Sequence, residues 1–251
     1  MIINLNDDVT YEIAPSNHST HDVYRGAGEP RGVLLPFYLL ADKSGSMVHA
    51  IDAVNAGLMG SLDALESHPM AASKVRLSVI GFNNQADVVL PMSDLREVEA
   101  IDELAAYGGT SYAAAFRLLK SMIDSDVRSL KEQGYKVHRP AVFFLSDGVP
   151  TDSNYEWESA LAELTSPSFP AHPNIIAFGM GDADERVIAK VATKEGFAFR
   201  HAGSGDLGQA VADFMEALTH SIIASGSVVA QGQPLQIAKP AGFLTIEADV
   251  I

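Results

Sequence analysis

The sequence predicts an α/β protein built on a doubly wound, mostly parallel sheet with helices on both faces. Three observations support this fold class. Short apolar runs alternate with amphipathic helical patterns, the connections between them are short, and one pair of runs is too close together for a crossover. The chain is 47% hydrophobic and 20% charged, which is ordinary for a globular protein. We therefore expect packed layers around a sheet.

Six strands are expected from apolar runs bounded by turn residues. The four strongest runs are residues 33–41, 75–82, 141–145 and 175–178, and the two weaker ones are 86–90 and 197–200. Only Asn83, Asn84 and Gln85 separate the second strand from residues 86–90, so these two strands should form an antiparallel hairpin at the edge. The expected sheet is therefore six-stranded and Rossmann-like, with one antiparallel edge strand.

Helical patterns fill the intervals between the strands. Apolar residues recur at steps of three and four from Met47 to Leu65, and again from Tyr112 to Leu130, after which Gly134 is a stop signal. A shorter pattern surrounds residues 187–191, and a final one covers residues 207–222. Because helices follow strands in turn, both faces of the sheet should be covered.

The alternation of predicted strands and helices is confined to the middle of the chain. We expect one domain over residues 31–225, with an N-terminal extension (1–30) and a C-terminal extension (226–251). Both extensions are rich in polar residues, glycine and proline, and each contains a brief apolar stretch. Either extension could fray or could add an edge strand to the sheet, and the sequence leaves both alternatives open.

Charge and composition exclude several classes of partner and site. The formal net charge of −15 repels phosphate backbones and anionic lipid, so neither nucleic acid nor a membrane is expected as a partner. Cysteine is absent, which excludes disulfides, thiol nucleophiles and thiolate metal sites. The longest apolar run, residues 33–41, is about half of what spans a bilayer, and no signal peptide is visible. We expect a cytoplasmic protein.

Hydroxyl and carboxylate residues follow the predicted strands where a doubly wound sheet binds ligands. Asp42-Lys43-Ser44-Gly45-Ser46 follows the first strand, and Ser146-Asp147-Gly148 ends the fourth. Thr110, after a pair of glycines, precedes a helix. These positions should meet at one edge of the sheet and offer two carboxylates and several hydroxyls. That ligand set suits a hard cation, Mg²⁺ first and Mn²⁺ or Ca²⁺ next, with one position open to an outside carboxylate.

The residues Asp42, Ser44, Ser46, Thr110 and Asp147 resemble the metal-ion-dependent adhesion site (MIDAS) of von Willebrand factor A domains, Asp-x-Ser-x-Ser…Thr…Asp. The segments LLPFYLLADKSGSM, GGTSYAAAF and RPAVFFLSDGVPTD are similar to those of bacterial TerY-like members, which are tied to tellurite resistance and stress. The resemblance covers residues 31–225. It implies direct ligation by Ser44 and Ser46, a switching role for Thr110, and Asp42 and Asp147 holding ligand waters or binding directly.

The resemblance also implies a function. Such domains are non-enzymatic modules that recruit a Glu or Asp of a partner protein through the ion, and TerY-like proteins occur beside a protein kinase and a phosphatase. We therefore expect no catalytic residues. Two alternatives remain open: a metal-dependent hydrolase that acts on phosphoesters through activated water, and an inert scaffold with a structural ion.

Several nearby motifs are assigned structural roles instead. Ser44 stands where an aspartyl-nucleophile phosphatase needs its second carboxylate, and no P-loop is present. Asp152 is left out of the ion site, because Pro150-Thr151-Asp152 could cap the helix that follows. Residues 179–184 are interpreted as a turn and cap before a helix rather than as a dinucleotide-binding loop. His49 is interpreted as a residue on a helix surface.

Overall fold

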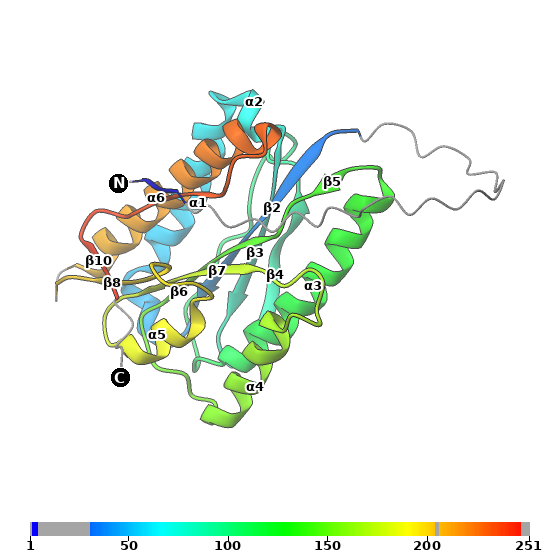
Figure 1. The fold of residues 1–251 in the computed structure, drawn as a ribbon. Helices are drawn as coiled ribbons and strands as arrows, with labels where there is room; N and C mark the ends of the chain where they lie inside the picture. The colour runs from blue at the N-terminus through cyan, green and yellow to red at the C-terminus, as the bar shows by residue number, and fades with distance from the viewer. Residues whose placement is uncertain (1, 5–30, 204–205, 247–251) are drawn as a thin grey trace.

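The structure is a computed structural model of the chain and describes residues 2–4, 31–203 and 206–246 (Figure 1). An eight-stranded sheet has the order β10-β8-β7-β6-β2-β3-β4, with β5 beside β2. Its strands are β2 (Val33–Asp42), β3 (Val75–Phe82), β4 (Ala86–Ser93), β5 (Lys136–Val137), β6 (Ala141–Ser146), β7 (Asn174–Gly179), β8 (Ala198–His201) and β10 (Phe243–Thr245). The chain leaves β2 toward β3 and returns to β6, so the strand order reverses between β2 and β6.

The predicted fold class is confirmed. Strand β2 pairs in parallel with β3 and β6, and β7 continues the parallel sheet to β8. The hairpin of β3 and β4 is antiparallel, as the short connection predicts. The strand number is larger than the expected six, because β5 and β10 span two and three residues. Segments that short become strands only through their pairing with β2 and β8.

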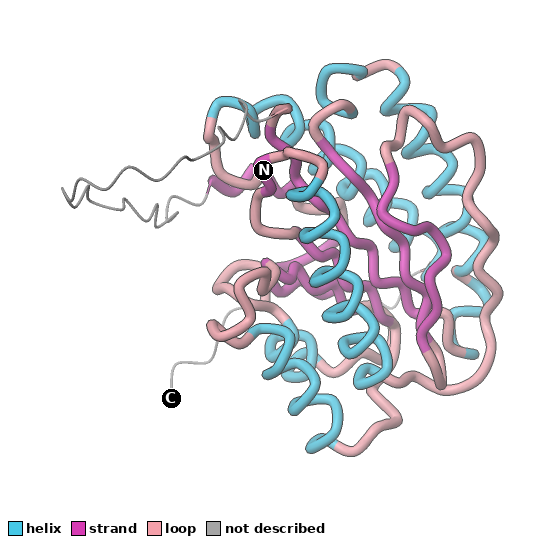
Figure 2. The backbone as a smooth tube through the Cα atoms, turned by 90° about the vertical axis from the view of Figure 1, so that its right-hand side faces the viewer, coloured by secondary structure: helices cyan, strands magenta, loops and turns pink. Residues whose placement is uncertain are grey.

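Helices cover both faces of the sheet (Figure 2). On one face lie α1 (Ile51–Glu66), α2 (Pro69–Ala72) and α6 (Leu207–Val228). On the other lie α3 (Tyr112–Glu132), α4 (Asn154–Thr165) and α5 (Glu185–Val191). Within the described ranges, no helix combines the length and the apolar character needed to cross a membrane.

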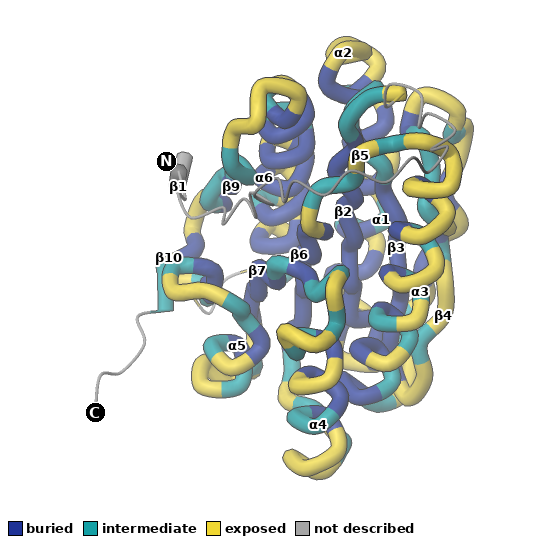
Figure 3. The backbone as a smooth tube through the Cα atoms, turned by 45° about the vertical axis from the view of Figure 1, so that its right-hand side comes forward, coloured by how far each residue is buried: buried dark blue, intermediate teal, exposed yellow. Residues whose placement is uncertain are grey.

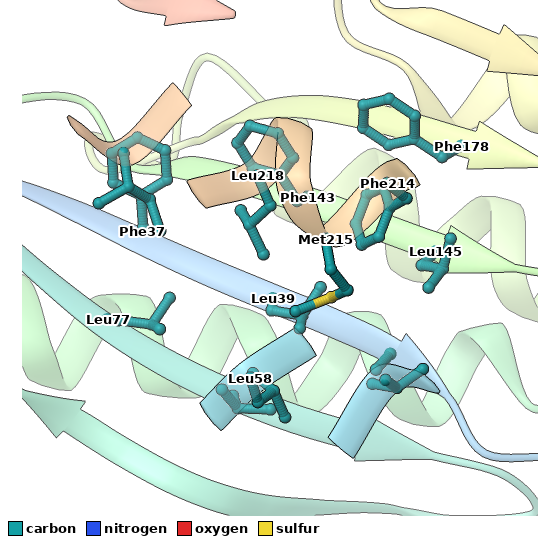
Figure 4. Close-up of a cluster of buried hydrophobic side chains, with 14 of the residues drawn as sticks. Phe37, Leu39, Leu58, Leu77, Phe143, Leu145, Phe178, Phe214, Met215 and Leu218 are labelled. Atoms are coloured by element: carbon teal, nitrogen blue, oxygen red, sulfur yellow. The ribbon is translucent and has the colours of Figure 1, made fainter. Parts of the chain in front are cut away.

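The alternation of β2 divides the core into two clusters. Phe37 and Leu39 face α1 and α6, where they join Phe214, Met215 and Leu218 (Figure 4). Tyr38 and Leu40 belong to the cluster under α3 and α4. Because successive side chains of a strand point to opposite faces, a strand covered on both sides is apolar throughout. In Figure 3 the central strands β2, β3, β6 and β7 are mostly buried, whereas the edge strand β4 is partly exposed.

The helix expected from Met47 to Leu65 is divided in the structure. A 3₁₀ helix, η1 (Gly45–His49), follows β2 directly, and α1 begins only at Ile51. Backbone bonds from Met47 to Ser44 and from Ala50 to Met47 make this turn tighter than an α-helix. The helical period in the sequence therefore extends one turn beyond the α-helix itself.

The two extensions contribute strands in different ways. The C-terminal one adds β10 to the edge of the main sheet, beside β8. It also contains η2 (Val229–Gln231) and β9 (Gln236–Ala238), which pairs with β1 (Ile2–Asn4) in a separate two-stranded sheet. Ile237 is buried in the same cluster as α6. Residues 5–30, most of the N-terminal extension, lie outside the described residues.

Candidate metal centre

The register of β2 and β6 positions the site. Ala41 pairs with Leu145, so Asp42 and Ser146 lie side by side at the carboxyl edge, where the strand order reverses. The Ser146 hydroxyl donates a hydrogen bond of 2.6 Å to Asp42 Oδ2. The loop after β2 and the loop after β6 are therefore joined through side chains at their first residues.

Four of the five predicted ligand residues form one continuous set of contacts. Asp42 Oδ1 accepts a hydrogen bond of 2.8 Å from the backbone N–H of Ser44. The Ser44 and Ser46 hydroxyl oxygens are 3.0 Å apart. The Ser46 hydroxyl donates to Asp147 Oδ1 at 2.8 Å. The hydroxyls of the first loop thus lie between the two carboxylates.

Thr110 borders the same space from a third loop. A Cβ atom on Gly148 would lie 3.8 Å from Ser46 Oγ and 3.9 Å from Thr110 Oγ1, so both hydroxyls flank this point. No hydrogen bond joins Thr110 Oγ1 to the other four predicted ligand residues, all of which the structure describes. Thr110 is 5% exposed. The structure therefore brings all five predicted residues to one edge, with Thr110 beside the bonded set.

Backbone contacts fix the loop that carries Thr110. Its N–H donates to Thr151 Oγ1 at 3.2 Å, and its carbonyl accepts from the Thr151 N–H at 2.8 Å. The Gly45 N–H donates to the Gly108 carbonyl at 3.0 Å, and a Cβ on Gly45 would lie 3.3 Å from that oxygen. Gly108 has a φ of +77°, which glycine adopts without strain. These contacts hold the three loops in register.

The site carries negative charge without a counter-ion among the described residues. Burial raises the pKa of Asp42 to about 6, against the opposing hydrogen bonds from Ser146 and Ser44. Burial also raises the pKa of Asp147, and the charge of Asp182 adds to the effect. Lys43 does not neutralise them, because its ammonium lies 2.5 Å from Asp87 Oδ1. Two buried carboxylates of this kind favour a bound cation.

The sequence did not single out Ser146 as a partner of the site. Its signal is a hydroxyl one residue before Asp147, at the last position of a buried strand. Among the described residues, no group of three or more His, Cys, Asp or Glu side chains is arranged to hold a metal. The oxygens that lie beside Asp42 and Asp147 here belong to hydroxyl groups, those of Ser44, Ser46 and Ser146.

The expected role of Asp152 is wrong. Asp152 accepts hydrogen bonds of 2.8 Å from Ser111 Oγ and from the Ala113 N–H, so it binds the start of α3 rather than the helix that follows it. Ser153 caps that following helix, α4, in a capping box with Glu156. Asp152 thus fastens the third loop to the second, outside the ion site.

The remaining structural assignments are confirmed. Asp184 caps α5 by accepting a hydrogen bond of 2.8 Å from the Arg186 N–H, as expected for residues 179–184. His49 is exposed on η1. Neither residue contacts the five predicted ligand residues through a hydrogen bond.

Comparison with known proteins relates this architecture to one family. Residues 37–149 match the model of the von Willebrand factor type A domain. No curated protein sequence matches the chain. Solved structures do: a von Willebrand factor type A protein from Catenulispora acidiphila has 14% identity and a TM-score of 0.53, over 76% of this chain and 43% of that chain.

Two further solved structures share the fold. The pilus adhesin SpaC from Lactobacillus rhamnosus GG, in an open conformation, has 14% identity and a TM-score of 0.58 over 78% of this chain and 30% of that chain. Proximal thread matrix protein 1 from the mussel byssus, with a zinc-occupied MIDAS motif, has 13% identity and a TM-score of 0.51 over 74% of this chain and 49% of that chain. This chain spans less than half the length of each of the three proteins. Together with the sheet order, the match over residues 37–149 and the similar structures show that the chain has the fold of von Willebrand factor type A domains.

Proposed function

We propose that the chain is a non-enzymatic, Mg²⁺-dependent protein-binding module. Asp42, Ser44, Ser46, Thr110 and Asp147 would hold the ion at the carboxyl edge of the sheet. The observation that carries this proposal is the pair of buried carboxylates, Asp42 and Asp147, with hydroxyls between them and no cationic side chain paired to either in the described part of the chain.

The spacing of these oxygens fits the ion. In octahedral coordination with Mg²⁺–oxygen distances near 2.1 Å, neighbouring ligand oxygens are about 3.0 Å apart. Ser44 Oγ and Ser46 Oγ are 3.0 Å apart, and Ser46 Oγ is 2.8 Å from Asp147 Oδ1. Their hydrogen bonds to one another can be exchanged for bonds to an ion with little movement. Asp42 holds the loop through Ser44 and Ser146 and offers its remaining acceptor positions to ligand water.

The open position would receive a Glu or Asp of a partner protein. Neutral hydroxyls leave a divalent ion with net positive character, which favours an anionic last ligand. The zinc-occupied motif of the mussel protein and the adhesin among the similar structures support this assignment. Because the chain has a net charge of −15, the partner's carboxylate should be surrounded by basic groups.

The biological setting is part of the proposal. The TerY-like segments around Asp42, Thr110 and Asp147 favour a bacterial tellurite or stress-response system, in the cytoplasm, with an associated kinase or phosphatase as the partner. Residues 31–225 would form the binding domain. The C-terminal extension would be tied to it by the pairing of β10 with β8 and by the burial of Ile237 of β9 in the cluster under α6.

Parallel co-purifications from the native cell, with Mg²⁺ and with EDTA, test this function. The expected result is a partner recovered only with Mg²⁺ and lost in Asp147→Asn and Ser46→Ala. Asp184→Asn is the control, since it removes an exposed carboxylate that caps α5. A partner retained equally in EDTA would contradict the proposal. Phosphoester turnover that vanishes in Asp147→Ala would favour the hydrolase, and stabilisation by Mg²⁺ without any partner would favour the scaffold.

A further inference from the structure

Cations gather at the edge of the sheet opposite the ion site. Arg31, Lys74 and Lys136 lie where β2, β3 and β5 begin. Arg128 and Lys131 occupy the last turns of α3, and Arg139 precedes β6. Helix α3 begins beside the ion site and ends at this edge. These six residues, Arg31, Lys74, Arg128, Lys131, Lys136 and Arg139, are the basic edge; five of them are exposed and Lys74 is half-buried.

Backbone contacts bring the segments of the basic edge together. The Arg31 N–H donates to the Gly134 carbonyl at 2.9 Å, and the Lys136 N–H donates to the Gly32 carbonyl at 2.9 Å. Lys74 Nζ would lie 3.9 Å from a Cβ on Gly32. Three parts of the chain thus present their cations side by side.

The basic edge differs from the rest of the surface in its ion pairs. Elsewhere in the described chain most cations are paired: Lys43 with Asp87, Arg76 and Arg96 with Asp94, Lys120 with Glu163, Lys190 with Glu158, and Arg200 with Glu185. On the basic edge, the only ion pair within the described residues joins Arg128 to Asp124. The chain contains 32 acidic residues, yet five of these six cations have no carboxylate partner among the described residues, which favours an anion from outside.

A groove of about 400 Å³ lies within this edge. Arg128, Lys131 and Arg139 line it together with one carboxylate, that of Asp124. The apolar lining side chains include Val127, Val137, Pro140 and Phe169. Val127 and Pro140 are buried while the three cations are exposed, so the groove has an apolar floor. On its rim Asp124 pairs with Arg128, which leaves Lys131 and Arg139 as the cations without an ion pair in the described chain. Arg139 is oriented by a hydrogen bond of 2.7 Å from its guanidinium to the His172 carbonyl.

We propose that this groove binds an extended acidic segment of a partner protein, with one apolar side chain on the floor and carboxylates paired to Lys131 and Arg139. The apolar floor, formed by valine, proline and phenylalanine side chains, suits one aliphatic or aromatic side chain of a peptide. The net charge of −15 repels a long polyanion and directs a short acidic segment to the basic edge alone. The groove is at the opposite end of the sheet from Asp42 and Asp147, so binding here is independent of the ion.

The test uses the full-length chain and a fluorescein-labelled peptide of alternating Glu and Ser with one central Phe. Fluorescence anisotropy should show saturable binding that weakens as NaCl rises from about 50 mM to about 500 mM. The same peptide with Ser in place of Phe should bind more weakly. Addition of EDTA should leave the affinity unchanged, which separates this site from the proposed ion site.

Charge-reversal variants test which residues bind the peptide. The double variant Lys131→Glu, Arg139→Glu should lower the affinity for the peptide about tenfold or more. Arg117→Glu with Arg186→Glu is the matched control, because both are exposed cations without ion pairs in the described chain and lie away from the groove. The milder pair Lys131→Gln with Arg139→Gln should give an intermediate loss, with the fold checked by circular dichroism.

Three results would overturn the proposal. They are absence of saturable binding, an equal loss in the Arg117 and Arg186 control, and tighter binding of a nucleic acid oligomer than of the peptide. A further variant, Asp7→Asn with Asp8→Asn, examines the chain's own acidic segment. If it raises the affinity for the peptide, residues of this chain occupy the groove and the assignment to a partner is wrong.

Discussion

The Ser46 hydroxyl donates a hydrogen bond of 2.8 Å to Asp147, although 101 residues separate the two in the sequence. Ser46 belongs to η1, which follows β2, and Asp147 directly follows β6. The bond crosses the point where the strand order reverses. Because it joins two proposed ligands of one ion, its loss should affect metal binding more than folding.

Ser46→Ala and Asp147→Asn should each lower the affinity for Mg²⁺ at least tenfold, as measured by isothermal titration calorimetry. Each removes one oxygen ligand or its charge, and Asp147→Asn keeps the shape of the side chain. Ser166→Ala, an exposed-loop hydroxyl bonded only to Ser168 in the described chain, is the control. Unchanged Mg²⁺ affinity in Asp147→Asn would show that the ion binds elsewhere.

Mg²⁺ should raise the melting temperature. An ion that binds only the native state stabilises by about 1.4 kcal/mol at ten times Kd, which corresponds to roughly 3–5 °C for a chain of this size. Differential scanning calorimetry should show this rise, with a reduced one in Ser44→Ala. NaCl at matched ionic strength is the control, since screening also stabilises an acidic protein. A shift fully reproduced by NaCl would show that no specific site is involved.

Thr151→Val should weaken Mg²⁺ binding several-fold without removing a ligand. The Thr151 hydroxyl accepts from the Thr110 N–H and lies 3.1 Å from the Thr110 carbonyl, so it positions the loop of a proposed ligand. Thr165→Val, which removes a bond to the Leu161 carbonyl in α4, provides the comparison. Equal effects of both variants on Mg²⁺ affinity would argue against a positioning role.

Asp126→Asn should stabilise the protein increasingly as the pH rises above 3.8. Burial raises the pKa of Asp126 above its ordinary value of 3.8, against the hydrogen bond from Tyr38. The folded protein therefore binds the proton more tightly than the unfolded chain, and wild-type stability is lost as the pH rises through the folded pKa. Asparagine does not titrate. The difference in unfolding free energy between Asp126→Asn and the wild type should therefore grow as the pH rises, and level off above the folded-state pKa of Asp126.

Urea unfolding of both proteins across pH 3–8 measures this difference. Asp124→Asn removes the same charge from an exposed position on the same helix and controls for net charge. A difference that does not change with pH would contradict the role of Asp126.

Two glycines of α1 should respond to alanine in opposite directions. A Cβ at Gly57 would lie 2.5 Å from Met215 Cβ on α6, so Gly57→Ala should cost about 1–3 kcal/mol. Gly60 has no heavy atom within 4 Å of the same position, so Gly60→Ala should stabilise by about 0.5–1 kcal/mol. Urea unfolding measures both, and destabilisation by Gly60→Ala would show that α1 packs differently.

The convergence of the five predicted residues could be anticipated because strand ends are visible in the sequence. Asp42 and Asp147 each follow an apolar run, and parallel strands place their carboxyl ends at one edge. The bond from Ser146 to Asp42 could not be anticipated, because it depends on the direction of a strand's last side chain. Asp152 was misassigned because α4 is nearer in sequence while α3 begins nearer in space.

Pairing and charge balance also lie beyond the sequence pattern. The three residues of β10 form a strand only because β8 offers an open edge. The cations of the basic edge are spread from Arg31 to Arg139 in the sequence. Among the described residues only Arg128 has a carboxylate partner, and this follows from which segments meet. Periodicity reports which face of an element is buried and not which charges become neighbours.

The pairing of Ala41 with Leu145 also bears on how the chain folds. Strands β2 and β6 are joined by a long intervening segment, so their contact closes slowly compared with the β3–β4 hairpin. The proposed ligand set is complete only once that contact has formed in the native alignment. A shift of one residue would turn the side chains of β2 to the other face and take Asp42 away from Ser146. Metal binding during refolding should therefore report when β2 and β6 have paired. It should occur later than the formation of the local helices.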